Sequence, residues 1–161
     1  MTLTVGTDSY ISVADADTYF GARLYATTWT GAASTDKEKA LRMAAKALDR
    51  ESYVGIISDP NQVQAWPRTG GADLEGRIID AAAIPQAIID AQCELALRYL
   101  IEDPTDDSGT LGVRSINAGG VAISYDGRAP QRRLPDMVLT LIRSLLTPTG
   151  AAGASSAPLV R

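Results

Sequence analysis

The segment from Ile84 to Ile101 constrains the fold most, because apolar residues cover most of its helical circumference. Pro85 favours a helix start, since proline is common at the first helical position. Two apolar stripes follow, one formed by Ile88, Ala91, Leu95 and Tyr99 and the other by Ile89, Cys93, Leu97 and Leu100. Polar residues recur every fourth position, at Gln86, Asp90, Glu94 and Arg98. So narrow a polar stripe predicts a central helix of a bundle.

Three further helices are expected around this central one. Ser12 as N-cap with Asp15 at the third helical position is close to a capping box and predicts a helix at about residues 13–24. A stronger capping box, Thr35-Asp36-Lys37-Glu38, predicts a helix at about 36–51. A last helix is expected at about 135–146. The sequence therefore predicts a mainly α fold, a small bundle of about four helices.

Four other segments are expected to lack helices. Residues 27–34 form a loop, and residues 52–84 form a long central loop that is either functional or packed on itself. Alternating apolar residues at about 111–126 predict a β-hairpin, which is marginal alone and has to pack on something, such as a neighbouring subunit. Residues 147–161 are rich in Ala, Gly and Ser and predict a flexible C-terminal arm on a helical domain, 1–146.

The composition excludes several functional classes. The 161 residues include no histidine, which removes Ser-His-Asp and Cys-His catalysis and histidine metal ligands. The single cysteine, Cys93, can form neither an intrachain disulfide nor a zinc site. No apolar run approaches the roughly 20 residues that cross a bilayer, and no signal peptide is visible. We therefore expect a non-enzymatic protein of a reducing compartment, with no cofactor and no membrane partner.

Charge is divided unevenly along the chain. The net charge is −4, but residues 1–110 contain 9 basic and 17 acidic side chains, whereas residues 111–161 contain 6 and 2. Arg128, Arg132 and Arg133 form a basic set that can contact either phosphates or an acidic protein. Surfaces that bind single strands combine a basic groove with aromatic side chains, so the acidic balance and the few aromatic residues weaken that interpretation.

Two other candidate sites have a plainer interpretation, which we favour. An acidic loop with Asp103, Asp106 and Asp107 can hold a hard cation, but it lacks the spacing of an EF-hand and is explained as a solvated loop. Cys93 can be a reactive thiol, but on a buried helix face it is expected to be an inert core residue. Neither site therefore predicts metal or thiol chemistry.

The string Trp66-Pro67-Arg68-Thr69-Gly70 is the most distinctive in the chain. Pro67 pushes Trp66 into an extended conformation, and a tryptophan held in this way is an anchor in a core or in an interface. Arg68 can span a subunit boundary or bind nearby carbonyl groups. We hypothesise that Trp66 and Arg68 hold the long loop in place, at or near a subunit contact.

Several strings make the sequence similar to a known family. They are Asp8–Asp17, Lys37–Leu41, Gln64–Gly70, Ile84–Ala87 and Cys93–Leu97, and with the hairpin they cover about residues 8–146. Through these strings, the chain resembles the head–tail connector proteins of tailed bacteriophages, also called adaptor or head-completion proteins. Members of that family are often labelled DnaT-like single-stranded DNA-binding.

The resemblance implies a homo-oligomeric ring, of about twelve copies, that docks beneath the portal protein at the capsid vertex. Such a ring extends the channel through which duplex DNA passes without sequence-specific binding, and it offers a platform to the next tail or neck protein. The resemblance further implies a place in the neck of the virion, synthesis in the host cytoplasm and no enzyme activity. The alternative is a single-stranded DNA-binding accessory protein of replication.

For the adaptor role, the expected interface residues lie in the central loop, the hairpin, the basic set and the C-terminal arm. The hairpin is expected at the inner or tail-facing side of the ring, and the arm is expected to order against the portal. The residues are Trp66, Arg68, Val121, Ile123, Tyr125, Arg128, Arg132, Arg133, Pro158, Leu159, Val160 and Arg161.

Overall fold

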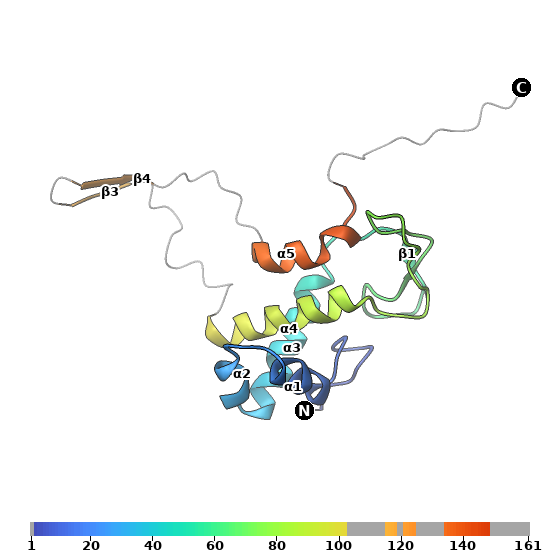
Figure 1. The fold of residues 1–161 in the computed structure, drawn as a ribbon, viewed down its shortest axis with the longest axis horizontal. Coiled ribbons are helices and arrows are strands. Elements are labelled where there is room, and N and C mark those ends of the chain that lie inside the picture. The colour runs from blue at the N-terminus through green and yellow to red at the C-terminus, as the bar shows by residue number, and fades with distance from the viewer. Residues whose placement is uncertain (1, 103–114, 119–120, 125–133, 149–161) are drawn as a thin grey trace, which may run out of the picture.

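The computed structural model describes residues 2–102, 115–118, 121–124 and 134–148 (Figure 1). The helices are α1 (Val13–Gly21), α2 (Thr27–Gly31), α3 (Ser34–Leu48), α4 (Gln86–Ile101), α5 (Asp136–Ile142) and the 3-10 helix η2 (Arg143–Leu145). The strands are β1 (Ile56–Ile57), β2 (Arg68–Thr69), β3 (Ser115–Ala118) and β4 (Val121–Ser124). The predicted mainly α fold is confirmed. Among these helices, none is both long and apolar enough to cross a membrane.

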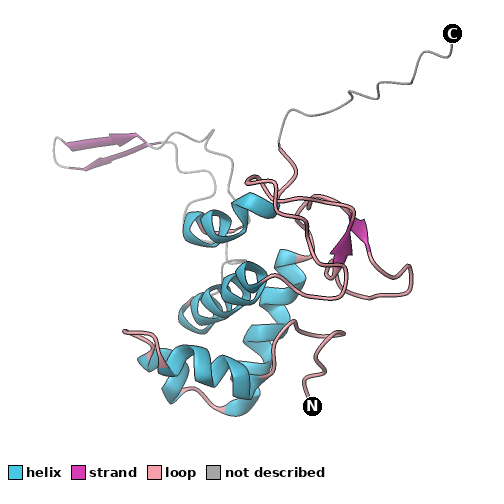
Figure 2. Ribbon diagram, turned by 45° about the vertical axis from the view of Figure 1, so that its right-hand side comes forward, coloured by secondary structure: helices cyan, strands magenta, loops and turns pink. Residues whose placement is uncertain are grey.

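Helix α4 lies at the centre of the helical body, as its two apolar stripes predict. It packs against α3 on one side and α5 on another, and α2 also contacts it (Figure 2). Its buried residues are Ile88 and the stretch from Ala91 to Leu97, and they include Leu95, which is almost completely buried. Each large aliphatic side chain buried in this way contributes about 1.5–3 kcal/mol, so α4 organises the core.

Gln92 is one of two buried polar residues of α4, with Glu94, and the sequence pattern does not single it out. Its Oε1 accepts a hydrogen bond from the Tyr10 amide at 3.0 Å. Its Nε2 donates to Ser9 Oγ at 2.6 Å and to the Leu41 carbonyl at 2.9 Å. Because its amide is fully paired, Gln92 ties the N-terminal segment and α3 to the central helix without leaving a buried polar atom unsatisfied.

The loop predicted at 27–34 is wrong in part, because the segment contains the short helix α2. Trp29 on α2 is completely buried, and its ring stacks on Phe20 with 4.5 Å between the centroids. This packing outweighs the weak helix propensity of the neighbouring threonines. Helix α1 ends at Gly21 rather than near residue 24, which leaves room for the turn into α2.

The helix ends differ from the predictions by a few residues. Ser12 caps α1 through its side-chain oxygen, as predicted. Helix α3 instead begins at Ser34 without a side-chain cap, so the predicted capping box at Thr35 is wrong. Pro85 is the N-cap of α4 rather than its first helical residue, and the helix predicted at 135–146 is divided into α5 and η2. Boundaries are less determined by sequence than the helices themselves.

Residues 52–84 fold into a lobe beside the helices, and we call this segment the lobe from here on (Figures 1 and 2). Strands β1 and β2 pair antiparallel within it, with Ile56 opposite Thr69. The Val54 amide donates to the Leu145 carbonyl at 3.0 Å, which fastens the lobe to η2. The long loop is therefore packed on itself and on the end of the helical body.

Strands β3 and β4 form the predicted hairpin, with Ser115 opposite Ser124 and Ala118 opposite Val121. Figure 1 shows the two strands apart from the helices. The outer ends of the hairpin, predicted at 111 and 126, lie outside the described residues. The same holds for the C-terminal arm beyond Pro148.

Candidate functional site

Trp66 anchors the lobe to the core of the protein. Its side chain is buried, and its ring meets the Tyr53 ring edge-on with 5.3 Å between the centroids. The peptide bond between Trp66 and Pro67 is cis. Of the two settings that the sequence leaves open, the structure therefore places Trp66 in a core. The contact with another subunit that we assign to this region stays a prediction.

Arg68 ties the two sides of the lobe together through its guanidinium group. Its Nη2 donates to the Gly55 carbonyl at 2.7 Å and to the Tyr53 carbonyl at 3.4 Å. Its Nε donates to the Val54 carbonyl at 2.9 Å, and its Nη1 donates to the Ala65 carbonyl at 3.2 Å. Only the planar fork of arginine reaches several carbonyls in this way. Arg68 thus binds nearby carbonyls, one of its two expected roles.

The backbone of the lobe is closely packed at Gly55 and Gly71. Gly55 has a φ of +74°, and a Cβ atom there would lie 2.5 Å from the Thr69 carbonyl oxygen. A Cβ atom at Gly71 would lie 2.9 Å from the Gly55 nitrogen. Because both positions exclude a side chain, the two strands can approach, and the lobe has a defined shape.

The outer surface of the lobe carries large apolar side chains that the core does not cover. Ile78 is 88% exposed and Val63 is 71% exposed, although isoleucine and valine are among the residues most often buried. We call the set of exposed side chains the apolar lobe surface, and it consists of Ile56, Ile57, Val63, Leu74 and Ile78. Exposed apolar side chains of this size are available for contact with another protein.

A hollow of ≈ 190 Å³ lies beside Ile78, where the lobe meets the start of α4 and the end of η2. Ile79, Pro85 and Leu145 contribute to its apolar lining, and Asp80 lies at the same hollow. The Arg77 guanidinium, which also lines it, is paired with carboxylates of the lobe. The hollow is therefore apolar with an acidic margin.

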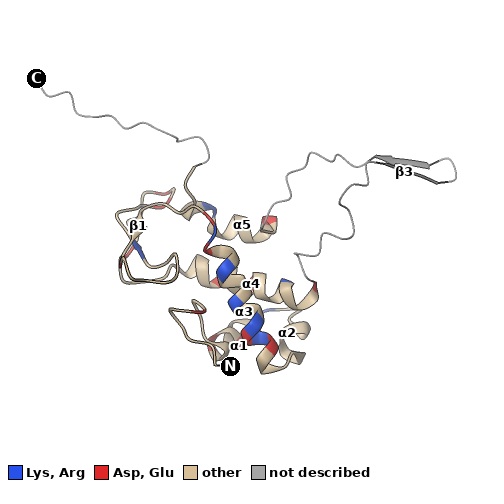
Figure 3. Ribbon diagram, turned by 180° about the vertical axis from the view of Figure 1, so that it is seen from behind, with Lys and Arg blue, Asp and Glu red and all other residues tan. Residues whose placement is uncertain are grey.

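Most cations of the helical body and lobe are committed to partners within the chain. Residues 2–102 and 134–148 contain ten Lys and Arg against fifteen Asp and Glu. Arg68 binds carbonyls, and six others form ion pairs: Arg23, Lys37, Lys39, Arg42, Arg77 and Arg98. Figure 3 shows acidic and basic positions interleaved along α3. Since phosphate binding needs available cations, these ranges provide few side chains for binding nucleic acid.

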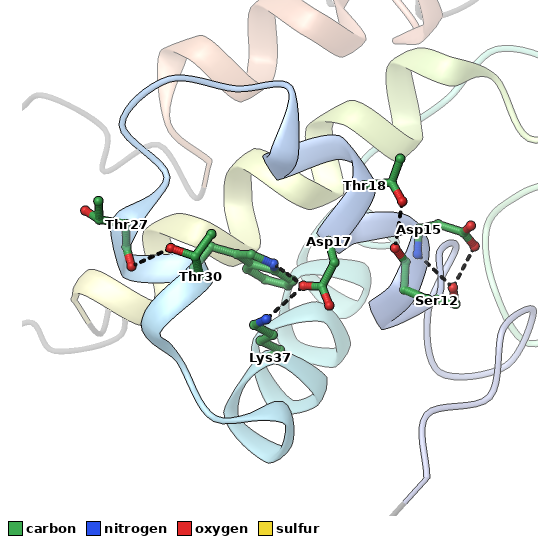
Figure 4. A network of polar contacts seen from close by, with 9 residues as sticks. Ser12, Asp15, Asp17, Thr18, Thr27, Thr30 and Lys37 are labelled. Atoms are coloured by element: carbon green, nitrogen blue, oxygen red, sulfur yellow. Dashed lines mark hydrogen bonds and ion pairs between the residues drawn. The ribbon is translucent and has the colours of Figure 1, made fainter.

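The Asp17 carboxylate joins the first three helices through hydrogen bonds (Figure 4). Its Oδ1 accepts hydrogen bonds from Trp29 Nε1 at 2.7 Å and from Lys37 Nζ at 2.8 Å. Burial alone would raise the pKa of Asp17, but these hydrogen bonds outweigh burial and hold the pKa below its usual range.

A second ionic cluster fixes the turn after α1 to the central helix. Glu94 on α4 is buried, and its Oε2 accepts a hydrogen bond from Arg23 Nη2 at 2.8 Å. Its Oε1 accepts another from the Tyr19 hydroxyl at 2.9 Å. Burial raises the pKa of Tyr19, and the hydrogen bond to Glu94 raises it further. The polar stripe of α4 thus serves internal pairing at this position.

The remaining candidates of the sequence analysis fall in different places. Val121 and Ile123 lie in β4. Cys93 is completely buried, and burial raises the pKa of its thiol to about 12. Within the described ranges, no group of three or more Cys, Asp and Glu is placed to hold a metal ion. The acidic loop at 103–107 lies outside the described residues, as do Tyr125, Arg128, Arg132, Arg133, Pro158, Leu159, Val160 and Arg161.

Comparison with protein families gives one match over nearly the whole chain. Residues 2–161 match a family described as "Putative DnaT-like ssDNA binding protein". Comparison with curated proteins and with solved structures finds no match.

Proposed function

The chain belongs to this DnaT-like family, and within it we propose a structural role, as a ring subunit that joins the portal protein to the tail of a phage. The observation that carries the proposal is the apolar lobe surface on a body whose cations are mostly paired internally. Such a surface suits binding to proteins better than binding to phosphates. The resemblance of the sequence strings to head–tail connectors supports the same role.

The lobe is well suited to repeated protein contacts because its shape is fixed before a partner arrives. The buried Trp66 ring, the Arg68 hydrogen bonds and the close approach at Gly55 all limit its motion. A preformed surface loses little conformational entropy on binding, so more of its contact energy appears as affinity. This favours an assembly protein, and the role needs neither enzyme activity nor a cofactor.

The charge of the body agrees with a channel through which DNA moves. Phosphate contacts supply most non-specific affinity for DNA. A ring built from subunits whose described body is acidic would let duplex DNA pass without holding it. We therefore place the protein in the neck of the virion, between the portal and the next tail or neck protein.

The C-terminal arm, 147–161, supplies a direct test of portal docking. Its small residues cannot form a core, but they can fill a groove on another protein. Deleting residues 149–161 should abolish docking of the purified protein to portal rings while the circular dichroism and the unfolding midpoint stay unchanged. Docking that survives the deletion would contradict this part of the proposal.

The family description supports a second candidate, a single-stranded DNA-binding protein. The basic set that the sequence analysis assigns to such binding is Arg128, Arg132 and Arg133, which lie outside the described residues. Filter binding with single-stranded DNA at about 150 mM salt separates the two candidates, because phosphate contacts give tight binding with a steep salt dependence. The adaptor role predicts weak binding. Tight binding that is lost when the three arginines are replaced by alanine would favour the second candidate.

A further inference from the structure

The turn between α1 and α2 exposes two large apolar side chains, Leu24 and Tyr25, which we call the apolar turn. Leu24 is 78% exposed and Tyr25 is 90% exposed. Tyr25 also has a φ of +59°, and among the described residues it alone, apart from glycines, has a positive φ. A left-handed backbone is strained for a bulky residue. Packing within the chain does not offset this strain, because both side chains face solvent, so the turn calls for a functional explanation.

The apolar turn is held in a fixed position by contacts on both of its sides. On one side, Arg23 Nη2 donates to Glu94 Oε2 on α4 at 2.8 Å, and Arg23 Nη1 donates to the Leu24 carbonyl at 3.0 Å. On the other side, Ala26 is buried. The Tyr25 ring is therefore presented on a preformed support, which limits the conformational entropy that a contact through this ring would lose.

The apolar turn and the hollow beside Ile78 lie at different places along α4. Figure 1 shows the connection between α1 and α2 beside the C-terminal half of α4, whereas the lobe lies where α4 begins. Glu94, which holds the turn, follows Pro85, which lines the hollow, by nine positions, or about 14 Å along the helix axis. Neither Leu24 nor Tyr25 lines the hollow, so the turn leaves the hollow of its own chain open.

The hollow matches a tyrosine side chain in size and in polarity. Its volume is ≈ 190 Å³, and an apolar cavity of about 150 Å³ is large enough to hold a benzene ring. The Asp80 carboxylate at its margin accepts a hydrogen bond from the Ala82 amide at 2.9 Å, and it has no ion-pair partner among the described residues. A tyrosine hydroxyl can donate to such a carboxylate. An occupant with an apolar ring and a hydrogen-bond donor at its tip therefore suits the hollow.

We propose that Tyr25 of one copy inserts into the hollow beside Ile78 of a second copy, where its hydroxyl donates to Asp80. Leu24 then packs on the apolar lobe surface of that second copy. Tyrosine is enriched among the residues that dominate interface energies, and such residues occupy well-packed pockets. Because the two surfaces differ, the contact is head-to-tail, and its repetition closes into a ring when the rotation between copies allows it. The inference rests on the proposed ring, and it specifies which surfaces form the subunit interface.

Cysteine cross-linking in the full-length protein tests this contact. One preparation carries Leu24→Cys, and the other, with a tag that changes its mass, carries Ala83→Cys, an exposed position that lines the hollow. The native Cys93 is completely buried and should not react. After mixing and treatment with a short bis-maleimide, we expect a covalent heterodimer in several-fold excess over both homodimers. The matched control replaces Leu24→Cys with Met137→Cys, an exposed apolar position on α5 that belongs to neither surface, and should give little heterodimer.

Two further substitutions test whether the cross-link depends on the proposed contact. Adding Tyr25→Asp to the Leu24→Cys chain should lower the heterodimer yield to that of the control, because the ring is lost and a carboxylate faces Asp80. Aspartate adopts the left-handed conformation more readily than tyrosine, so this variant should fold, which circular dichroism checks. Adding Ile78→Asp to the Ala83→Cys chain changes a side chain that is 88% exposed, and it should lower the yield in the same way from the other side of the contact.

Three results would overturn the inference. One is the absence of heterodimer although both introduced thiols react with a monofunctional maleimide. Another is a heterodimer yield that neither aspartate substitution lowers. The third is an excess of the Leu24→Cys homodimer, which would show that two apolar turns meet each other instead. None of these results depends on virus particles, so the adaptor role can fail while this contact stands, and the reverse.

Discussion

Replacing Arg68 with methionine should loosen the lobe, because it removes the guanidinium that four backbone carbonyls share. The two shortest hydrogen bonds, to Gly55 at 2.7 Å and to Val54 at 2.9 Å, should dominate the loss. A hydrogen bond to a charged group contributes about 1.5–3 kcal/mol, and Arg68 is only half-buried, so water can replace part of the loss. We expect the free energy of unfolding to fall by about 3 kcal/mol.

Urea unfolding measures the global loss, and hydrogen exchange followed by mass spectrometry measures the loss within residues 52–84. Arg68→Lys should recover less than half of the difference, since a lysine keeps the charge but cannot reach several carbonyls. Arg77→Met is the matched control, because Arg77 lies in the same lobe but is 73% exposed and pairs only with Asp73 and Glu75. It should change little.

The reasoning would be refuted if Arg68→Met left both the free energy of unfolding and the exchange of the lobe as they are in the natural protein. It would also fail if Arg77→Met were equally damaging. In either case, the carbonyl contacts of Arg68 would not be what holds the lobe together.

Three further predictions follow from single contacts. Gly55→Ala should lower the free energy of unfolding by about 2 kcal/mol, because of the left-handed backbone and the Thr69 carbonyl at 2.5 Å from a Cβ atom; a fully stable variant would contradict this close approach. Glu94→Gln should cost about 2 kcal/mol in chemical denaturation, since it leaves Arg23 without its carboxylate, and an unchanged midpoint would show that the pair is dispensable. Cys93 should react with maleimide at pH 8 only after denaturant is added, since burial raises its pKa to about 12; rapid labelling of the folded protein would show that the thiol is accessible.

The sequence predicts the central helix well because a helix that is apolar around most of its circumference is stable only when other elements surround it. The apolar pattern of residues 84–101 is therefore sufficient to identify α4 as the helix that others surround, here α3 and α5. The same pattern does not identify Gln92, which interrupts an apolar face. Its partners at Ser9 and Leu41 are far away in sequence, and only the folded chain brings them to its amide.

Helix α2 is not predicted from the sequence, for a different physical reason. Its threonines and glycine have weak helix propensity, so the local signal indicates a loop. The helix forms because Trp29 is buried against Phe20 and hydrogen-bonded to Asp17, and both partners lie on α1. Here, tertiary contacts determine the secondary structure.

The lobe shows how far a motif can be interpreted. The string around Trp66 and Arg68 predicts an anchor. It leaves open whether Trp66 lies in a core or in an interface, and whether Arg68 binds carbonyl groups or spans a subunit boundary. The carbonyls that Arg68 binds come from residues 53–55 and 65, and nothing in their sequence marks them as partners. In the same way, Ile56 and Ile78 have the composition of core residues, and only the fold places them outside.

Electron cryomicroscopy tests the proposed adaptor role most directly, on phage particles assembled in cells that express this chain with a fused tag. The account predicts a ring of tagged subunits at a single capsid vertex, between the portal and the tail. Particles that lack the protein, with the tagged chain instead bound to single-stranded DNA in infected cells, would contradict it.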